Sequence, residues 1–128
     1  MSTDPMQTHG AVSWIEYQGQ DPEAAQAFYG KVLGWTIAPM PMQDGSPYTG
    51  IMLGEQPIGG FAHEAAPASA WLTYITVDDT NARTRAAAEA GATIVTEPFD
   101  IPGVGRMSVI QDPFGATLAL ITYEQKEG

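Results

Sequence analysis

The sequence predicts an α+β fold in which two βαβββ repeats form a curved, eight-stranded mixed sheet. Two observations lead to this fold: the chain resembles itself at a fixed offset, and each copy has one helical segment among short strands. The chain has 128 residues, of which 44% are hydrophobic, which suits one domain. We therefore expect a single domain over residues 1–128, with a first unit at 10–64 and a second at 70–124.

The repeat is visible when the sequence is compared with itself at an offset of 57 positions. The matched pairs are Trp14/Trp71, Tyr17/Tyr74, Asp21/Asp78, Ala25/Ala82, Gly34/Gly91, Ile37/Ile94 and Pro41/Pro98. Asp is a residue type that begins helices and Gly is one that ends them, so the matches include positions with structural roles. The repeat therefore indicates a shared architecture.

The first unit begins with a strand at residues 12–17, followed by a helix start at Asp21, Pro22 and Glu23. The helix has one apolar stripe, made of Ala25, Phe28, Tyr29, Val32 and Leu33. Gly34 ends the helix. Strands are expected at 35–38, 48–53 and 57–62, separated by turns rich in Pro and Gly.

The second unit follows an Ala/Pro/Ser linker at 65–70 and begins with a strand at Trp71. Its helix is capped by Asp78 or Asp79 and presents small residues, Ala82, Ala86 and Ala90, before Gly91. Alanines bury little area, so this helix should pack closer to its sheet than the first. The remaining strands are expected at 92–95, 106–111 and 116–123, with a β-turn at 112–115.

One helix covers only one face of each predicted sheet, so the two uncovered faces must find partners. We expect them to meet and to form a concave groove, either within one chain or by exchange between two chains. A homodimer is the expected assembly.

Composition limits the classes of partner. Fifteen acidic and five basic residues give a net charge of −10, which disfavours nucleic acid and anionic membranes and favours cationic solutes. The absence of cysteine excludes disulfides, thiolate metal sites and a Cys nucleophile. No signal peptide or membrane span is evident in the sequence, so we expect a cytoplasmic protein.

Four motifs resemble a known superfamily. They are DPEAAQAFY at 21–29, GKVLGW at 30–35, WLTYITVDD at 71–79 and DPFGA at 112–116. From residue 12 to residue 123 the chain resembles the vicinal oxygen chelate proteins, which include glyoxalases, bleomycin resistance proteins and extradiol dioxygenases. The resemblance implies the doubled βαβββ fold and leaves the activity open, because these motifs belong to the scaffold.

Metal-dependent members of this superfamily bind a divalent ion with His, Gln or Glu on the first and last strands of each unit. The resemblance places these positions at Trp14, at Trp71 or Leu72, near Gly60 or Ala62, and at Ala119. None of these side chains is a metal ligand. We therefore expect a module with no metal and no cofactor.

Glu16 and His63 are the polar residues nearest to these positions. Glu16 alternates with Trp14 and should face the groove, where a carboxylate can act as a general base or pair with a cation. The alternatives are a salt bridge, for example with Arg106, or exposure to solvent. His63 has no partner in the sequence pattern and is interpreted as a loop residue.

Aromatic residues indicate the class of ligand. Trp14, Trp35, Tyr48 and Trp71 are candidate walls for a planar or cationic molecule, although strand aromatics also form cores. Trp14 and Trp71 are favoured because the repeat matches them. Arg106 is a candidate partner for a carboxylate or enolate oxygen, or else a surface residue.

The leading hypothesis is a metal-free binder of a small organic molecule, cationic or aromatic, in a groove between the repeats. The alternative is an enzyme, either cofactor-free with Glu16 as the base or a metal-dependent lyase or dioxygenase with other ligands. A third possibility is a groove filled by side chains in a module that mediates assembly.

Overall fold

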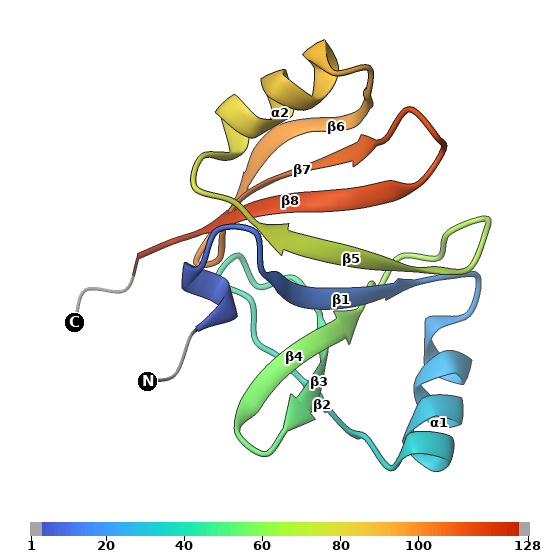
Figure 1. The fold of residues 1–128 in the computed structure, drawn as a ribbon. Helices are drawn as coiled ribbons and strands as arrows, with labels where there is room; N and C mark the ends of the chain where they lie inside the picture. Colours follow the sequence, from blue (N-terminus) through green and yellow to red (C-terminus); the bar gives the residue numbers. More distant parts are fainter. Residues whose placement is uncertain (1–3, 126–128) are drawn as a thin grey trace. The chain divides into compact units, whose positions relative to one another are not determined.

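The computed structural model of the chain describes residues 4–125 (Figure 1). The elements in chain order are η1 (Pro5–Gln7), β1 (Val12–Gln18), α1 (Pro22–Leu33), β2 (Thr36–Pro39), β3 (Thr49–Leu53), β4 (Gln56–Phe61), β5 (Ala70–Thr76), α2 (Thr80–Glu89), β6 (Thr93–Ile101), β7 (Gly105–Gln111) and β8 (Thr117–Tyr123). The predicted order of strands and helices is confirmed, and the 3-10 helix η1 is an addition that the sequence pattern did not indicate. The predicted domain range 1–128 extends beyond the described residues at both ends.

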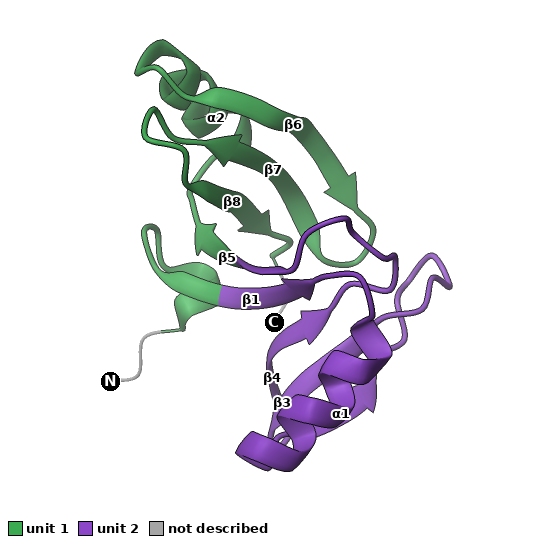
Figure 2. Cartoon of the chain, turned by 90° about the vertical axis from the view of Figure 1, so that its right-hand side faces the viewer, with its two compact units in different colours: residues 1–13, 73–128 green, residues 14–72 purple. Residues whose placement is uncertain are grey.

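The described residues form two compact units, shown in different colours in Figure 2. Unit 2 is residues 14–72 and contains the strand order β2-β3-β4-β1, with β1 parallel to β4 and the other pairs antiparallel. Unit 1 is residues 4–13 with 73–125 and contains the order β5-β8-β7-β6, with β5 parallel to β8. The α+β class with two βαβββ repeats is therefore confirmed.

The unit boundaries differ from the simple division of the sequence into two halves. The first two residues of β1, Val12 and Ser13, belong to unit 1, and the start of β5, including Trp71 and Leu72, belongs to unit 2. Ser13 Oγ is 2.9 Å from Tyr123 Oη, and this hydrogen bond joins β1 to β8 within unit 1. Each unit thus includes the start of the first strand of the other repeat.

Strand β6 is longer than the sequence indicated, because it continues past residue 95 to Ile101. β6 includes Pro98, and proline cannot donate to a neighbouring strand. β6 is the edge strand of unit 1, and its pairing with β7 is irregular between Ile94 and Phe99. An edge position with bulges accommodates the proline.

Both helices begin at an aspartate. Asp21 Oδ1 accepts a hydrogen bond from Ala24 N in α1, and Asp79 Oδ1 accepts one from Ala82 N in α2, each at 3.1 Å. The cap of α2 is therefore Asp79 rather than Asp78, and the repeat offset at the helix starts is 58 rather than 57. Gly34 and Gly91 follow the helices with positive φ angles of 71° and 105°, as the sequence predicted.

Helix α1 packs on its sheet through one aromatic side chain. Tyr29 contacts the rings of Tyr17, Trp35, Phe61 and Trp71, with ring centroids 5.3–6.4 Å apart. No residue of α1 is buried, and Phe28, Val32 and Leu33 are 56%, 58% and 53% exposed. The predicted apolar stripe is therefore packed only in part, with Tyr29 in the ring cluster and Phe28, Val32 and Leu33 exposed.

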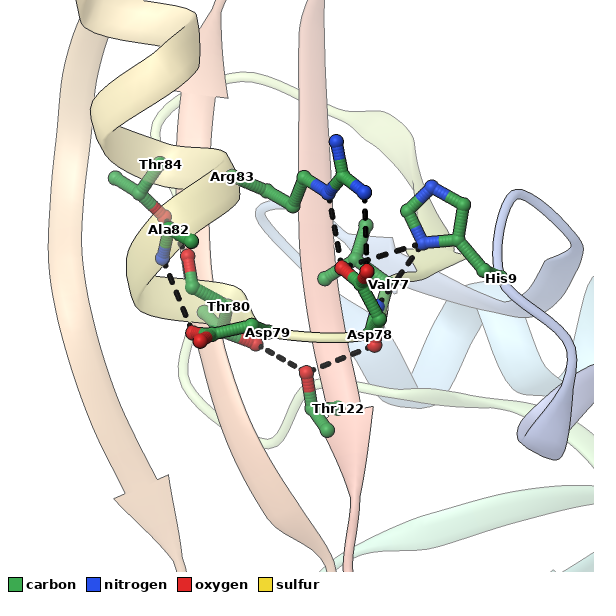
Figure 3. Close-up of polar contacts among 9 residues, drawn as sticks. All are labelled: His9, Val77, Asp78, Asp79, Thr80, Ala82, Arg83, Thr84 and Thr122. Atoms are coloured by element: carbon green, nitrogen blue, oxygen red, sulfur yellow. Dashed lines mark hydrogen bonds and ion pairs between the residues drawn. The ribbon is translucent and has the colours of Figure 1, made fainter.

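Helix α2 packs through hydroxyl groups. Its buried residues are Thr80 and Thr84, whereas Ala86 and Ala90 of the predicted alanine stripe are exposed. Thr84 Oγ1 is 2.7 Å from Ser108 Oγ of β7, and Thr80 Oγ1 is 2.9 Å from Thr122 Oγ1 of β8. Figure 3 shows Thr80 and Thr122 at the start of the helix. Paired hydroxyls therefore replace the alanine contact that the sequence indicated.

Asp78, the aspartate next to the cap, pairs with charged and polar groups (Figure 3). Arg83 Nε and Nη2 donate to its two carboxylate oxygens at 2.9 and 3.0 Å, and His9 Nδ1 accepts from its backbone N–H at 3.0 Å. The hydrogen bonds from Arg83, with the charge of that guanidinium, lower the pKa of Asp78 to about 2.

Among residues 4–125, no helix is long and apolar enough to cross a membrane.

Candidate functional site

The candidate site lies on the sheet face of unit 2 opposite α1, which we call the open face. Side chains alternate along β1, so Tyr17 points to the ring cluster under α1 while Trp14, Glu16 and Gln18 point to the open face. Trp14, Glu16 and Tyr48 are all partly buried. Of the residues that the sequence suggested for a site, these three come together.

Glu16 is held by two donors. Tyr48 Oη donates to Glu16 Oε2 at 3.0 Å, and Gln18 Nε2 donates to Glu16 Oε1 at 2.9 Å. Trp14 Nε1 in turn donates to Tyr48 Oη at 3.1 Å. The rings of Trp14 and Tyr48 are stacked, with centroids 6.4 Å apart and planes inclined by 28°. The result is one carboxylate in a fixed orientation beside two aromatic rings, an arrangement suited to a cation or a hydrogen-bond donor on a flat molecule.

The floor of the open face is made by glycines. Gly60 of β4 lies opposite Glu16 of β1, and Gly50 of β3 lies opposite Gly60. A Cβ atom on Gly60 would collide with the ring and hydroxyl of Tyr48, and one on Gly50 would collide with the side chain of Met40. The absent side chains therefore make room for Tyr48 and Met40 to lie against the sheet.

Trp35 and Trp71 lie away from Glu16, in the ring cluster under α1. Trp71 Nε1 donates to Tyr29 Oη at 3.3 Å, and the Trp35 and Trp71 rings are 5.9 Å apart. Trp71 therefore does not share the face of Trp14, although the sequence matched the two. An offset of 58 instead of 57 explains this, because a shift of one residue in a strand exchanges its faces, and Leu72 is the counterpart of Trp14.

Arg106 lies in unit 1, where its guanidinium forms hydrogen bonds with neighbouring side chains. Its guanidinium donates to Asn81 Oδ1 at 2.8 Å and to Asp100 Oδ1 at 3.1 Å. Arg106 therefore forms an ion pair with Asp100, whereas the salt bridge that the sequence suggested for it was with Glu16. Arg106 also lines a polar cavity of about 360 Å³, whose walls include Asp78, Asp79, Asp100 and Glu124. All four acids already accept hydrogen bonds: Asp79 caps α2, Asp78 and Asp100 accept from arginines, and Glu124 accepts from the backbone N–H of Gly103.

The metal positions of the superfamily do not fit a metal in this chain. Trp14 Nε1 is a donor, the space above Gly60 contains the Tyr48 ring, and Ala119 of β8 is paired with Tyr74 of β5 and offers no ligand atom. His63 is exposed in the segment after β4. Within residues 4–125, no group of three or more His, Asp and Glu is placed to bind a metal ion.

Two features of the site were missed by reasoning from the sequence. Gln18 alternates with Glu16 on β1, so the strand period contained the signal for it. The floor of Gly50 and Gly60 had no such signal, because it depends on the strand register and on the path of the segment between β2 and β3. Both features help to orient the Glu16 carboxylate, since Gln18 donates to it and Gly60 leaves room for Tyr48, which also donates to it.

Residues 11–120 match the family described as the glyoxalase/bleomycin resistance protein/dioxygenase superfamily. The chain belongs to this superfamily. Among curated proteins, it is 36% identical over 114 residues to "Putative glyoxylase CFP32" of Mycobacterium bovis, covering 88% of this chain and 44% of that protein. It is 28% identical over 127 residues to "Anthracycline biosynthesis protein DnrV" of Streptomyces peucetius, covering 87% and 46%. The chain thus spans about half the length of these curated relatives.

Solved structures share the fold of this superfamily member. A hypothetical protein, BH1468 from Bacillus halodurans, matches with a TM-score of 0.65 at 14% identity, over 94% of this chain and 100% of that one. Methylmalonyl-CoA epimerase from Mycobacterium tuberculosis matches with a TM-score of 0.58 at 16% identity, over 94% and 91%. At these identities the likeness supports the fold alone.

Proposed function

We propose that this superfamily member binds a small organic molecule, cationic or aromatic, on the open face of unit 2, without a metal or another cofactor. The observation that carries the proposal is the Glu16 carboxylate, oriented by Tyr48 and Gln18 and flanked by the stacked Trp14 and Tyr48 rings. A carboxylate attracts cations and accepts hydrogen bonds, while aromatic rings attract flat or cationic groups. The net charge of −10 adds a general attraction for cations.

The relative named for anthracycline biosynthesis supports an aromatic ligand, because anthracyclines are planar, fused-ring molecules. The absence of ligand atoms at Trp14, Gly60, Leu72 and Ala119 supports binding without a metal. Glu16 is also the residue that a cofactor-free enzyme would use as a base. Its two hydrogen-bond donors favour the binding role, since they fix the orientation of the carboxylate and each oxygen can still accept another bond.

A thermal-shift screen of the purified chain tests the proposal. The panel contains planar aromatic amines, hydroxylated polycyclic compounds, anionic thioesters and glutathione adducts. We expect stabilisation by the first two groups, because a ligand that binds only the folded state raises Tm. Stabilisation by the anionic compounds alone would contradict the proposal, as would near-stoichiometric nickel, zinc or iron in elemental analysis of the purified protein.

We also propose a homodimer, formed through the exposed apolar side chains at the C-terminal end of α1 and the nearby end of β3. Phe28, Val32, Leu33 and Leu53 are each more than half exposed. Thr36 pairs with Met52, so the register brings Leu53 close to the end of α1. The curated relatives are about twice as long, and a second copy would supply a comparable mass of protein. Light scattering should give a dimer mass that Val32→Glu reduces to a monomer, whereas a monomeric wild type would contradict this assembly.

A further inference from the structure

Tyr48 lies in the site as a ligand would. Its ring rests above Gly60, its hydroxyl donates to Glu16 Oε2, and the same hydroxyl accepts from Trp14 Nε1. A phenol oxygen has one hydrogen to donate and lone pairs to accept, so this geometry uses both capacities. The open face is thus complementary to a flat ring that bears a hydroxyl group.

Gly50 and Gly60 are needed for the space that a missing side chain leaves, and not for a backbone conformation that only glycine adopts. Neither Gly50 nor Gly60 has a positive φ angle, so their backbone conformations are open to other residues. The atoms nearest to a Cβ at Gly60 belong to the ring and hydroxyl of Tyr48, and those nearest to a Cβ at Gly50 belong to Met40. We call this two-glycine floor beside Glu16 the trough.

Tyr48 and Met40 reach the trough from the two ends of one connecting segment. Met40 N donates to Tyr48 O at 2.9 Å, which closes the segment at its base, between β2 and β3. Residues 43–47 between them are exposed. Because this backbone hydrogen bond holds the base of the segment, rotation of the Tyr48 side chain about its own bonds would leave the pairing of β2 with β3 in place.

We propose that the trough above Gly60 is the ring-binding part of the site, and that Tyr48 occupies it in place of the ligand. The ligand class is then a planar aromatic molecule with a hydroxyl group, which donates to Glu16 and accepts from Trp14. This narrows the cationic or aromatic ligand of the proposed function, on which it rests. A purely cationic group has no lone pair for Trp14 Nε1, whereas a phenol satisfies both partners.

Replacing the ring by a free molecule tests this directly. Tyr48→Ala removes the ring and hydroxyl, and 4-methylphenol is the chemical equivalent of the missing side chain. By calorimetry, we expect 4-methylphenol to bind Tyr48→Ala at least about 10-fold more tightly than toluene does, because toluene lacks the hydroxyl. Adding Glu16→Gln should weaken 4-methylphenol binding by about 10-fold or more, since the hydrogen bond to a charged acceptor is lost. Equal affinity for the two probes, or no binding of 4-methylphenol to folded Tyr48→Ala, would overturn the proposal.

Two variants serve as controls for the location. Met40→Ala opens the neighbouring part of the trough above Gly50, away from Glu16, and should not prefer 4-methylphenol to toluene. Gly60→Ala combined with Tyr48→Ala lacks the three atoms that would lie closest to the new methyl group, and circular dichroism checks that it folds. The methyl group raises the floor and should weaken 4-methylphenol binding about 10-fold. Unchanged binding in this double variant would place the probe elsewhere and contradict the proposal.

The same experiments separate this inference from the proposed function. If wild-type protein binds a cationic compound in a Glu16-dependent way while Tyr48→Ala ignores 4-methylphenol, the trough proposal fails and the proposed function stands. If Tyr48→Ala captures 4-methylphenol while no aromatic or cationic compound binds the wild type, the trough is a ring site and the proposed function fails.

Discussion

The two helices of the repeat begin with the same kind of cap but pack on their sheets through different side chains, aromatic rings in α1 and hydroxyl groups in α2. Asp21 and Asp79 each cap their helix through a hydrogen bond of 3.1 Å to a backbone N–H three residues later. In unit 2, α1 then contacts its sheet through Tyr29 and a cluster of rings, whereas in unit 1, α2 uses the hydroxyls of Thr80 and Thr84. The repeat has therefore kept its backbone signals while the chemistry of packing has diverged between the copies.

The two faces of the sheet in unit 2 also use their aromatic residues differently. The aromatic residues that do not face α1, Trp14 and Tyr48, are arranged around Glu16 with hydrogen bonds from Tyr48 and Gln18. Position in the strand period decides between the two roles, since Trp14 and Tyr17 lie on opposite faces of β1. Neighbouring aromatic residues of one strand thus belong to a core and to a candidate site.

Removing a core ring should have the largest effect. Phe61 is fully buried and contacts the rings of Tyr17, Tyr29 and Trp71. We expect Phe61→Ala to lower the free energy of unfolding by about 3–5 kcal/mol, through lost burial and the cavity left behind. Urea denaturation measures this loss. Phe114→Ala is the control, because Phe114 is 94% exposed and its removal should change stability by less than about 0.5 kcal/mol. Similar losses for the two variants would show that the ring cluster is not the core of unit 2.

Breaking the hydroxyl pair should have an intermediate effect in unit 1. Thr84→Val keeps the shape of the side chain but leaves the buried Ser108 hydroxyl without its 2.7 Å partner. We expect a loss of about 1–3 kcal/mol, from the cost of a buried unsatisfied hydroxyl. Adding Ser108→Ala should recover most of this loss, because both polar groups are then absent. Additive losses in the double variant would show that the two hydroxyls do not depend on each other.

Removing either helix cap should have a smaller effect of equal size in both units. Asp21→Ala and Asp79→Ala each remove a hydrogen-bond acceptor from the first turn, at a cost of about 1 kcal/mol. Chemical denaturation of the two variants provides the comparison. A loss in only one of them would mean that the shared caps do not stabilise the two copies alike.

Acid should have the smallest effect, and it concerns unit 1. Because the folded-state pKa of Asp78 is lowered to about 2 from an ordinary value of 3.8, its contribution to stability is present above pH 3.8 and is lost as the pH falls toward 2. We expect the Tm difference between wild type and Asp78→Asn to shrink over this range. The group is exposed, so the difference should be small, and salt should reduce it further. A Tm difference that stays constant from pH 5 to pH 2 would contradict the pairing of Asp78 with Arg83.

Much of the fold could be predicted because its signals are local. Asp21 followed by Pro22, and the glycines at 34 and 91, identify helix ends through short-range chemistry that needs no tertiary information. The alternation of Trp14 and Glu16 along β1 likewise placed both residues on one face. These features follow directly from the geometry of helices and strands.

Other features depended on register and could not be read from the sequence. The one-residue difference between offsets 57 and 58 decides whether Trp71 or Leu72 corresponds to Trp14. The residue identities at offset 57 favoured Trp71, whereas the helix caps at Asp21 and Asp79 give an offset of 58 and favour Leu72. The spacing identifies the apolar stripe of α1, but which members are covered depends on tertiary packing, since Tyr29 contacts Phe61 while Val32 and Leu33 are exposed. The glycine floor of the site required the pairing of Gly50 with Gly60, which only the folded sheet supplies.

The most direct test of the proposed site compares one ligand with three proteins. The best stabilising compound of the thermal-shift screen would be titrated calorimetrically into wild type, Glu16→Gln and Glu55→Gln. Glu55 is an exposed acid in the turn between β3 and β4, so its replacement removes the same charge away from the open face of unit 2. We predict that Glu16→Gln weakens binding by about 10- to 100-fold while Glu55→Gln leaves it within about 2-fold of wild type. Equal affinities for all three proteins would contradict the assignment of Glu16 to the ligand site.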